Sequence, residues 1–268
     1  MTKKPTFILG VGAQKSGTTW LYEYLKHSKN VDMGTHKEYH IWSARYRPYG
    51  LFSDWYITDK TSVEHDPGML FIFNMINEHG FYENYFKSLL TDQINVTGDI
   101  SPSYCGLSYR NFLDIKQRIE SAGFDLKVVF ILRDPVERCW SQAKMGAFRK
   151  NERDWSIFFK DNFKTLPYKY RTEYDKSIPV LEKVFDKDHL FIVLYEEMFT
   201  IEKLKQLSAF CGVDYDLSFR NKKFMQTNYY PIQETLAEEC YNFYYKTYMA
   251  MYEKFPQTKT LWKNYGKK

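Results

Sequence analysis

Short apolar runs alternate along the chain with segments whose apolar residues recur at helical spacing. The run at 6–12 ends in glycine, and residues 18–27 then place large apolar side chains on one face of a helix. A second run, at 126–133, has the β-branched content of a buried parallel strand. It is followed by Asp134 and Pro135, and proline suits the first turn of a helix. Both places therefore predict a strand, a turn and a helix.

The same alternation continues toward the C-terminus. A further strand is predicted at 189–198 between helices at 175–185 and 200–211. The segment 95–104 is predicted to be a short strand with a turn at Ser101-Pro102. Strands separated by helices are typical of a parallel sheet that is covered on both faces. We predict an α/β fold with a P-loop-like parallel sheet flanked by helices, and ligands bound beyond the carboxyl ends of its strands.

Four other segments give a weaker pattern. Residues 44–92 and 148–175 are rich in aromatic and polar side chains without clean periodicity, which predicts irregular insertions and short helices over the sheet. The stretch "NVDMG" at 30–34 is interpreted as a short strand segment, and 233–254 as one helix with an aromatic face. Nothing in the composition separates two halves, so residues 1–268 are expected to form a single domain.

Composition narrows the class of protein. Hydrophobic residues make up 44% and charged residues 26%, which is usual for a globular chain, whereas 19% aromatic is high. The formal net charge is +5 without a long basic block, which favours an anionic ligand over nucleic acid. No signal peptide and no apolar window of about 20 residues is present, so we expect a cytoplasmic protein without a membrane partner. The oligomeric state stays open.

The four cysteines are far apart and form no C-x-x-C pair. This spacing supports neither a metal site nor a disulfide framework. We therefore expect no bound metal and a reducing environment.

The loop "GAQKSGTT" at 12–19 keeps the glycine spacing of a phosphate-binding loop but changes its lysine. A Walker loop has Lys after the second glycine, whereas here Thr18 stands there and Lys15 comes before Gly17. Backbone N–H groups at the start of the following helix can still bind one phosphate. Lys15 would then lie beside that phosphate, where it can neutralise charge on a leaving oxygen.

Two other interpretations of this loop remain. It could be a glycine turn without a ligand, or it could belong to a divergent ATP-dependent kinase. A kinase would need a Walker-B aspartate after a hydrophobic strand, but Asp134 has an arginine before it and a proline after it.

Two motifs together resemble a known family. "GAQKSGTTWLYEYL" resembles the 5′-phosphosulfate-binding loop of sulfotransferases that use 3′-phosphoadenosine 5′-phosphosulfate (PAPS), and "VVFILRDPVERCWSQ" resembles their 3′-phosphate-binding segment. The resemblance implies PAPS as donor and 3′,5′-bisphosphoadenosine (PAP) as product. It also implies a set of donor-binding residues, namely Gln14, Lys15, Ser16, Gly17, Thr18, Thr19, Trp20, Arg133 and Ser141.

The residues themselves agree with the second motif. Arg133 at a strand end and Ser141 one or two turns into the next helix can both reach an anion, and a guanidinium fork suits phosphate oxygens. Alternatively, Arg133 could make only a strand-end salt bridge to Asp134 or Glu137. Ser141 alone would be an ordinary helical serine.

A third segment, "EYHIWS" at 38–43, resembles the E-x-H-[FY]-F segment of the heparan sulfate (glycosaminoglycan) branch, where the glutamate is the catalytic base. A carboxylate within hydrogen-bond reach can take the proton of an attacking hydroxyl. Glu38 is therefore the predicted base, with His40 as its competitor. Taken alone, Lys37 and Glu38 would be a solvated charged pair.

The chain also departs from that branch. It reads Asp99-Ile100-Ser101-Pro102 where the glycosaminoglycan enzymes often have E-K-[ST]-P, and their usual C-terminal disulfide has no counterpart here. The basic loop at 220–232 resembles one in bacterial relatives, which makes Lys222 and Lys223 candidate phosphate contacts or merely solvated lysines.

These features predict a bacterial or viral type of sulfotransferase. It would move a sulfuryl group from PAPS to a hydroxyl on a carbohydrate or small molecule, without a metal. The alternatives are a P-loop kinase and a non-catalytic nucleotide-binding module.

Overall fold

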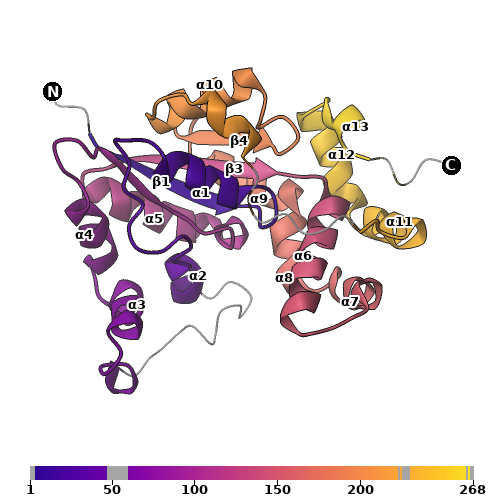
Figure 1. The fold of residues 1–268 in the computed structure, drawn as a ribbon, viewed down its shortest axis with the longest axis horizontal. Coiled ribbons are helices and arrows are strands. Elements are labelled where there is room, and N and C mark those ends of the chain that lie inside the picture. Colours follow the sequence, from indigo (N-terminus) through magenta and orange to yellow (C-terminus); the bar gives the residue numbers. More distant parts are fainter. Residues whose placement is uncertain (1–3, 47–59, 223, 225–229, 264, 266–268) are drawn as a thin grey trace.

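The computed structural model describes residues 4–46, 60–222, 224, 230–263 and 265. In this part of the chain, parallel strands form a sheet in the order β2-β1-β3-β4 (Figure 1). The strands are β1 (Thr6–Gly12), β2 (Val96–Ile100), β3 (Asp125–Leu132) and β4 (Leu190–Leu194). The predicted parallel sheet is confirmed.

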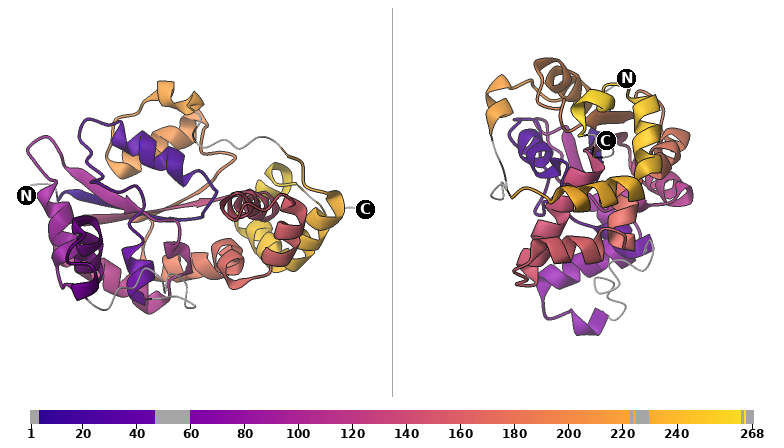
Figure 2. Two further views of the ribbon diagram at one scale, coloured as in Figure 1. Left: turned by 60° about the horizontal axis from the view of Figure 1, so that its bottom comes forward. Right: turned by 90° about the vertical axis from the view of Figure 1, so that its right-hand side faces the viewer.

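Helices cover both faces of the sheet because the strand side chains alternate between two apolar clusters. Ile8, Val129 and Ile131 pack with α1 (Thr18–Lys26) and α10 (Ile201–Cys211). Their neighbours Phe7, Leu9, Val128 and Phe130 pack with α4 (Phe81–Ser88), α5 (Tyr109–Ser121) and α9 (Tyr174–Val184). Figure 2 shows α1 and α10 together on one side of the sheet and the magenta helices on the other. A strand buried on both faces needs a continuous apolar run, which β1 and β3 have.

Helix α6 (Pro135–Arg149) begins where the sequence predicts it. The Asp134 carboxylate accepts hydrogen bonds from the amides of Val136 and Glu137, and Pro135 occupies the first turn. The hydroxyl of Tyr248 also donates to Asp134 at 2.7 Å. An aspartate cap stabilises a helix by about 1 kcal/mol, and here it fixes how the helix leaves β3.

The two unpatterned regions hold short helices, as expected. They contain α2 (Ile41–Tyr46), η3 (Lys60–Ser62), α3 (Pro67–Asn77) and α4 in the first region, and α7 (Trp155–Asn162) and α8 (Leu166–Thr172) in the second. The other short elements are η4 (Tyr104–Gly106), η5 (Leu217–Asn221) and α13 (Thr258–Leu261). None of the described helices is long and apolar enough to cross a bilayer.

Three predictions about single elements were wrong in detail. The C-terminal helix is two helices, α11 (Glu234–Phe243) and α12 (Tyr245–Lys254), that meet at Tyr244. The Tyr244 hydroxyl donates to the Phe163 carbonyl at 2.6 Å, which ties this junction to the end of α7. The expected strand at 30–34 is only a single bridge between Val31 and Val96. The predicted strand at 189–198 already ends at Leu194, because the following residues turn toward α10.

Candidate active site

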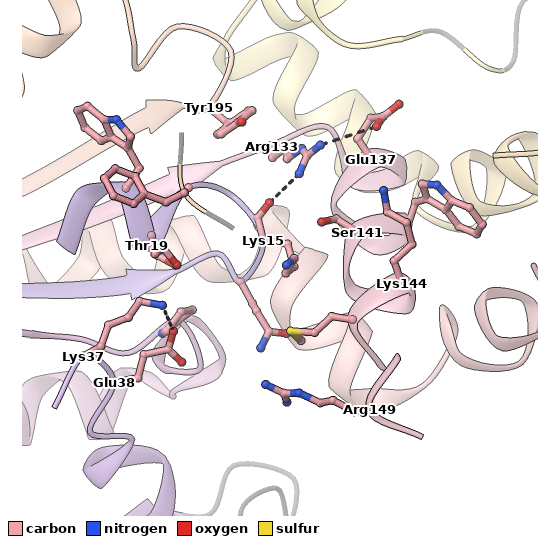
Figure 3. Close-up of a pocket in the computed structure, with 18 of the residues that line it drawn as sticks. Lys15, Thr19, Lys37, Glu38, Arg133, Glu137, Ser141, Lys144, Arg149 and Tyr195 are labelled. Carbon is pink, nitrogen blue, oxygen red and sulfur yellow. Dashed lines mark hydrogen bonds and ion pairs between the residues drawn. The ribbon is translucent and has the colours of Figure 1, made fainter. Parts of the chain in front are cut away.

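A cavity of about 650 Å³ opens beyond the carboxyl ends of β1 and β3 (Figure 3). Its walls come from the loop after β1, from Lys37 and Glu38, and from the segment 133–149 at the end of β3 and along α6. Aromatic side chains of Trp20, Tyr195 and Phe224 also line it. The cavity thus lies at the strand ends where the sequence places the ligand.

The loop between β1 and α1 is shaped to bind an anion. Lys15 and Gly17 have left-handed backbone conformations, with φ of 70° and 90°. Position 17 favours glycine for two reasons. Its backbone is left-handed, and a Cβ there would lie 3.1 Å from the Tyr195 ring. No side chain caps α1, so its first N–H groups keep their hydrogen-bonding capacity. Thr18 and Thr19 line the cavity beside them.

Two buried polar atoms of this loop have no hydrogen-bond partner among the described residues. They are Gln14 Oε1 and Ser16 Oγ. Buried polar groups are nearly always paired, so an unpaired atom indicates a missing partner. The Ser16 hydroxyl can donate to a ligand oxygen, whereas Gln14 Oε1 is an acceptor and needs a donor.

Arg133 joins this loop to α6. Its Nη1 donates to the Lys15 carbonyl at 2.9 Å, and its guanidinium lies over the ring of Tyr195 at 5.0 Å. It also forms an ion pair with Glu137 at 3.8 Å, so one of the salt bridges considered from the sequence exists. Asp134 instead caps α6. Arg133 and Ser141 line the same cavity as the loop.

Positive charge is concentrated around Lys15. Burial lowers the pKa of Lys15, and the nearby charge of Arg133 and then of Lys144, Lys37 and Arg149 lowers it further. Burial and Arg133 likewise lower the pKa of Lys144. Such mutual repulsion disfavours the charged forms until an anion binds among them.

Glu38 faces the cavity and is held from two sides. Its Oε1 lies 2.9 Å from Lys37 Nζ, and its Oε2 lies 3.0 Å from His40 Nε2. Burial alone would raise the pKa of Glu38. The hydrogen bond from His40 and the charge of Lys37 outweigh this and lower it to about 2. Lys37 and Glu38 therefore do form the charged pair considered from the sequence, and this pair lines the cavity.

His40 lies behind Glu38. Its side chain is 12% exposed against 28% for Glu38, and its Nδ1 is 2.8 Å from Ser103 Oγ. The His40 amide donates to Ser101 Oγ at 2.9 Å, and Ser101 in turn donates to Asp99 at 2.5 Å. This chain of hydrogen bonds ties the Glu38 segment to the end of β2.

These geometric features lead to the comparisons with known proteins. A family model described as the sulfotransferase family matches residues 5–217. The chain belongs to the sulfotransferase family. This membership confirms the resemblance, the enzyme class and PAPS as the sulfuryl donor with PAP as its product. It does not test the closeness to the heparan sulfate branch.

One solved structure supports the fold, and two others are more distantly similar. The sulfotransferase from Alicyclobacillus acidocaldarius is similar with a TM-score of 0.61 and 19% identity, over 94% of this chain and 96% of that one. The sulfotransferase domain of the Synechococcus PCC 7002 olefin synthase gives 0.46 and 15%, over 90% and 89%. Mouse SULT7A1 complexed with PAP gives 0.48 and 12%, over 96% and 87%. No curated protein matches the chain significantly.

Other site predictions for this sulfotransferase fall in different places. Trp20 is buried at the aromatic end of the cavity. Lys222 lies 4.2 Å from the ring centroid of Phe219 and lines a separate hollow beside Lys26. Lys223 lies outside the described residues. Ile100 is fully buried in the cluster under α1, so this position does not face the cavity.

Sequence reasoning missed several cations of this sulfotransferase. Lys37, Lys144 and Arg149 line the cavity. A signal for Lys144 was available, because Glu137, Ser141 and Lys144 follow one another at helical spacing on α6. Arg149 is at the end of that helix, where periodicity is less informative. In the residues that the structure describes, no group of His, Cys, Asp or Glu has the arrangement of a metal site.

Proposed function

We propose that the cavity holds PAPS between the loop after β1 and the start of α6, and that Glu38 accepts the proton of an attacking hydroxyl. The observation that supports this most is that two predicted anion sites, the loop and the Arg133–Ser141 pair, line one cavity. PAPS carries phosphate on both sides of its ribose and therefore needs two such sites. A cavity of about 650 Å³ is also in the range of nucleotide-sized ligands.

The charges of the cavity fit this donor. Five cations line it, namely Lys15, Lys37, Arg133, Lys144 and Arg149, against the two carboxylates Glu38 and Glu137. A ligand with two phosphates and a sulfate offsets that excess. The aromatic end formed by Trp20, Tyr195 and Phe224 suits a purine ring, which stacks on such side chains.

Lys15 is the residue that we assign to the leaving group. PAPS supplies an activated sulfuryl group, and transfer leaves negative charge on the oxygen that bridged sulfur and phosphorus. Lys15 lies in the loop that binds the 5′-phosphate, so its ammonium can neutralise that oxygen. Thr18 and Thr19 with the first N–H groups of α1 would hold the phosphate.

Glu38 is assigned as the base because it reaches the cavity while His40 is bonded behind it. In the free enzyme Lys37 and His40 hold the pKa of Glu38 at about 2, which makes it a weak base. An anionic donor competes with Glu38 for Lys37, and loss of that partner raises the basicity of the carboxylate. We propose a hydroxyl of a carbohydrate or small molecule as the acceptor.

Thermal unfolding with and without nucleotide tests the binding step. We expect PAP to raise the unfolding temperature, because a ligand at 100 times its Kd stabilises the folded state by about 2.7 kcal/mol. ATP with magnesium should give a much smaller shift. The reverse order would favour a kinase. If PAP stabilised the protein while no acceptor in a broad screen received labelled sulfate from PAPS, that result would indicate a non-catalytic nucleotide-binding module.

Arg133→Gln should mainly weaken donor binding. The change removes the guanidinium beside Ser141, and loss of a charge-assisted contact to phosphate costs about 2 kcal/mol, or about thirtyfold in affinity. We expect a KM for PAPS raised by about that factor with a smaller change in kcat. Arg110→Gln on α5, an exposed arginine outside the cavity, is the control. An unchanged KM in Arg133→Gln would remove this residue from the donor site.

A further inference from the structure

A second arginine, Arg138, contacts the loop between β1 and α1. Arg138 is the fourth residue of α6 and is fully buried. Its Nη1 donates to the Gln14 carbonyl at 3.3 Å and to Gln142 Oε1 at 2.7 Å. Its Nη2 lies 3.1 Å from Cys139 Sγ, and its Nε has no partner among the described residues.

No carboxylate in the described part of the chain forms an ion pair with Arg138. Its recorded partners are a carbonyl, an amide and a thiol, with the ring of Tyr168 at 5.8 Å. A buried charge without a counter-ion costs several kcal/mol. Arg138 does not itself line the cavity, but it contacts the Gln14 carbonyl of the loop that does.

The contact to Gln14 also orients the loop. In a trans peptide the C=O and the following N–H point in opposite directions. When Arg138 holds the Gln14 carbonyl, the Lys15 N–H points away from the arginine, and no described residue accepts a hydrogen bond from it. Arg133 holds the next carbonyl, that of Lys15, at 2.9 Å. Two arginines from one strand–helix segment thus hold consecutive loop carbonyls.

We propose that Arg138 is a positioning residue whose charge is balanced by the 5′-phosphate of the nucleotide, and that it fixes the Gln14–Lys15 peptide for that phosphate. This inference rests on the proposed function. It assigns Arg138 to the 5′ side of the nucleotide, whereas Arg133 and Ser141 serve the 3′ side.

The nearest alternative counter-ion is the thiol of Cys139. Burial raises the pKa of this thiol, but hydrogen bonds and the charge of Arg138 lower it overall to about 6. A thiolate could then pair with Arg138 without any ligand. Cys139→Ala separates the two cases, because it removes the thiol and leaves the arginine.

Titration calorimetry on the full chain with three nucleotides tests the proposal. The probes are PAP, adenosine 5′-phosphate and adenosine 3′-phosphate. Arg138→Gln keeps an amide donor and removes the charge, so PAP and adenosine 5′-phosphate should bind about tenfold more weakly or worse. Adenosine 3′-phosphate, which lacks the group that Arg138 serves, should bind as to the wild type. Arg138→Lys should recover part of the lost affinity, and Cys139→Ala should bind all three normally.

The unfolding temperature without ligand gives an independent readout. Because no described carboxylate pairs with Arg138 in the free protein, Arg138→Gln should unfold at the wild-type temperature or above it. Unchanged affinity for PAP, an equal loss for both monophosphates, or failure of Arg138→Gln to fold while Arg138→Lys folds would each overturn the proposal. If the wild type itself does not bind PAP, the proposed function fails instead.

Discussion

Lys15→Ala should lower kcat by about two to three orders of magnitude while most of the affinity for PAP is kept. Removing one group that stabilises developing negative charge typically costs a factor of about 10² to 10³. In PAP the sulfuryl group is absent, so the contact that Lys15 makes during transfer matters less for its binding. Steady-state kinetics with saturating PAPS, together with PAP titration of the same variant, measures both quantities.

Lys144→Ala is the matched control for this prediction. Lys144 is a cation of the same cavity, and burial and the charge of Arg133 lower its pKa. The pKa of Lys15 is lowered in the same way, by burial and then by the charges of Arg133, Lys144, Lys37 and Arg149. Lys144 stands on α6 and not on the loop that we propose holds the 5′-phosphate. We expect it to change KM for PAPS more than kcat. Equal losses of kcat in the two variants would mean that Lys15 contributes only general positive charge.

The loop and α6 could be predicted because local chemistry determines them. Glycine at 17 permits a left-handed backbone, and Asp134 with Pro135 specifies a helix start. These signals act within a few residues, so they survive without tertiary information. The parallel order of strands follows from the same local alternation, because a strand–helix–strand unit returns in the same direction.

The surroundings of Glu38 could not be predicted in the same way. His40 is linked through Ser101 to Asp99, about sixty residues further along the chain, and its ring also bonds Ser103. Nothing local in either segment marks this contact. The Lys37–Glu38 pair shows the limit most clearly, because neighbouring opposite charges are common on protein surfaces and only the fold places this pair at a cavity.

Buried cations lie beyond sequence reasoning for a related reason. An arginine near the start of an amphipathic helix is normally solvent-exposed, yet Arg138 is fully buried under Gln14. The break at Tyr244 likewise coincides with a hydrogen bond to Phe163, which belongs to another helical region. Helix propensity predicts neither, because packing against distant elements decides both.

Glu38→Gln should reduce kcat by about 10² to 10⁴ with little change in PAP affinity, because an amide keeps the shape but cannot take a proton. His40→Asn is the companion variant, since asparagine tolerates the left-handed backbone that His40 adopts at φ 57°. If His40 only orients Glu38 through its 3.0 Å contact, His40→Asn should lose clearly less activity than Glu38→Gln.

The pH dependence of the wild-type enzyme separates the two candidates further. The pKa of Glu38 is lowered to about 2, so this carboxylate stays ionised, and kcat/KM should show no loss from its protonation above about pH 4. Donor binding that draws Lys37 away raises this pKa within the complex, so kcat should begin to fall at a higher pH than kcat/KM as acid is added. The opposite result would be a loss of activity in acid that occurs at the same pH for kcat and kcat/KM. If Glu38→Gln kept this loss and His40→Asn abolished it, His40 would be the base.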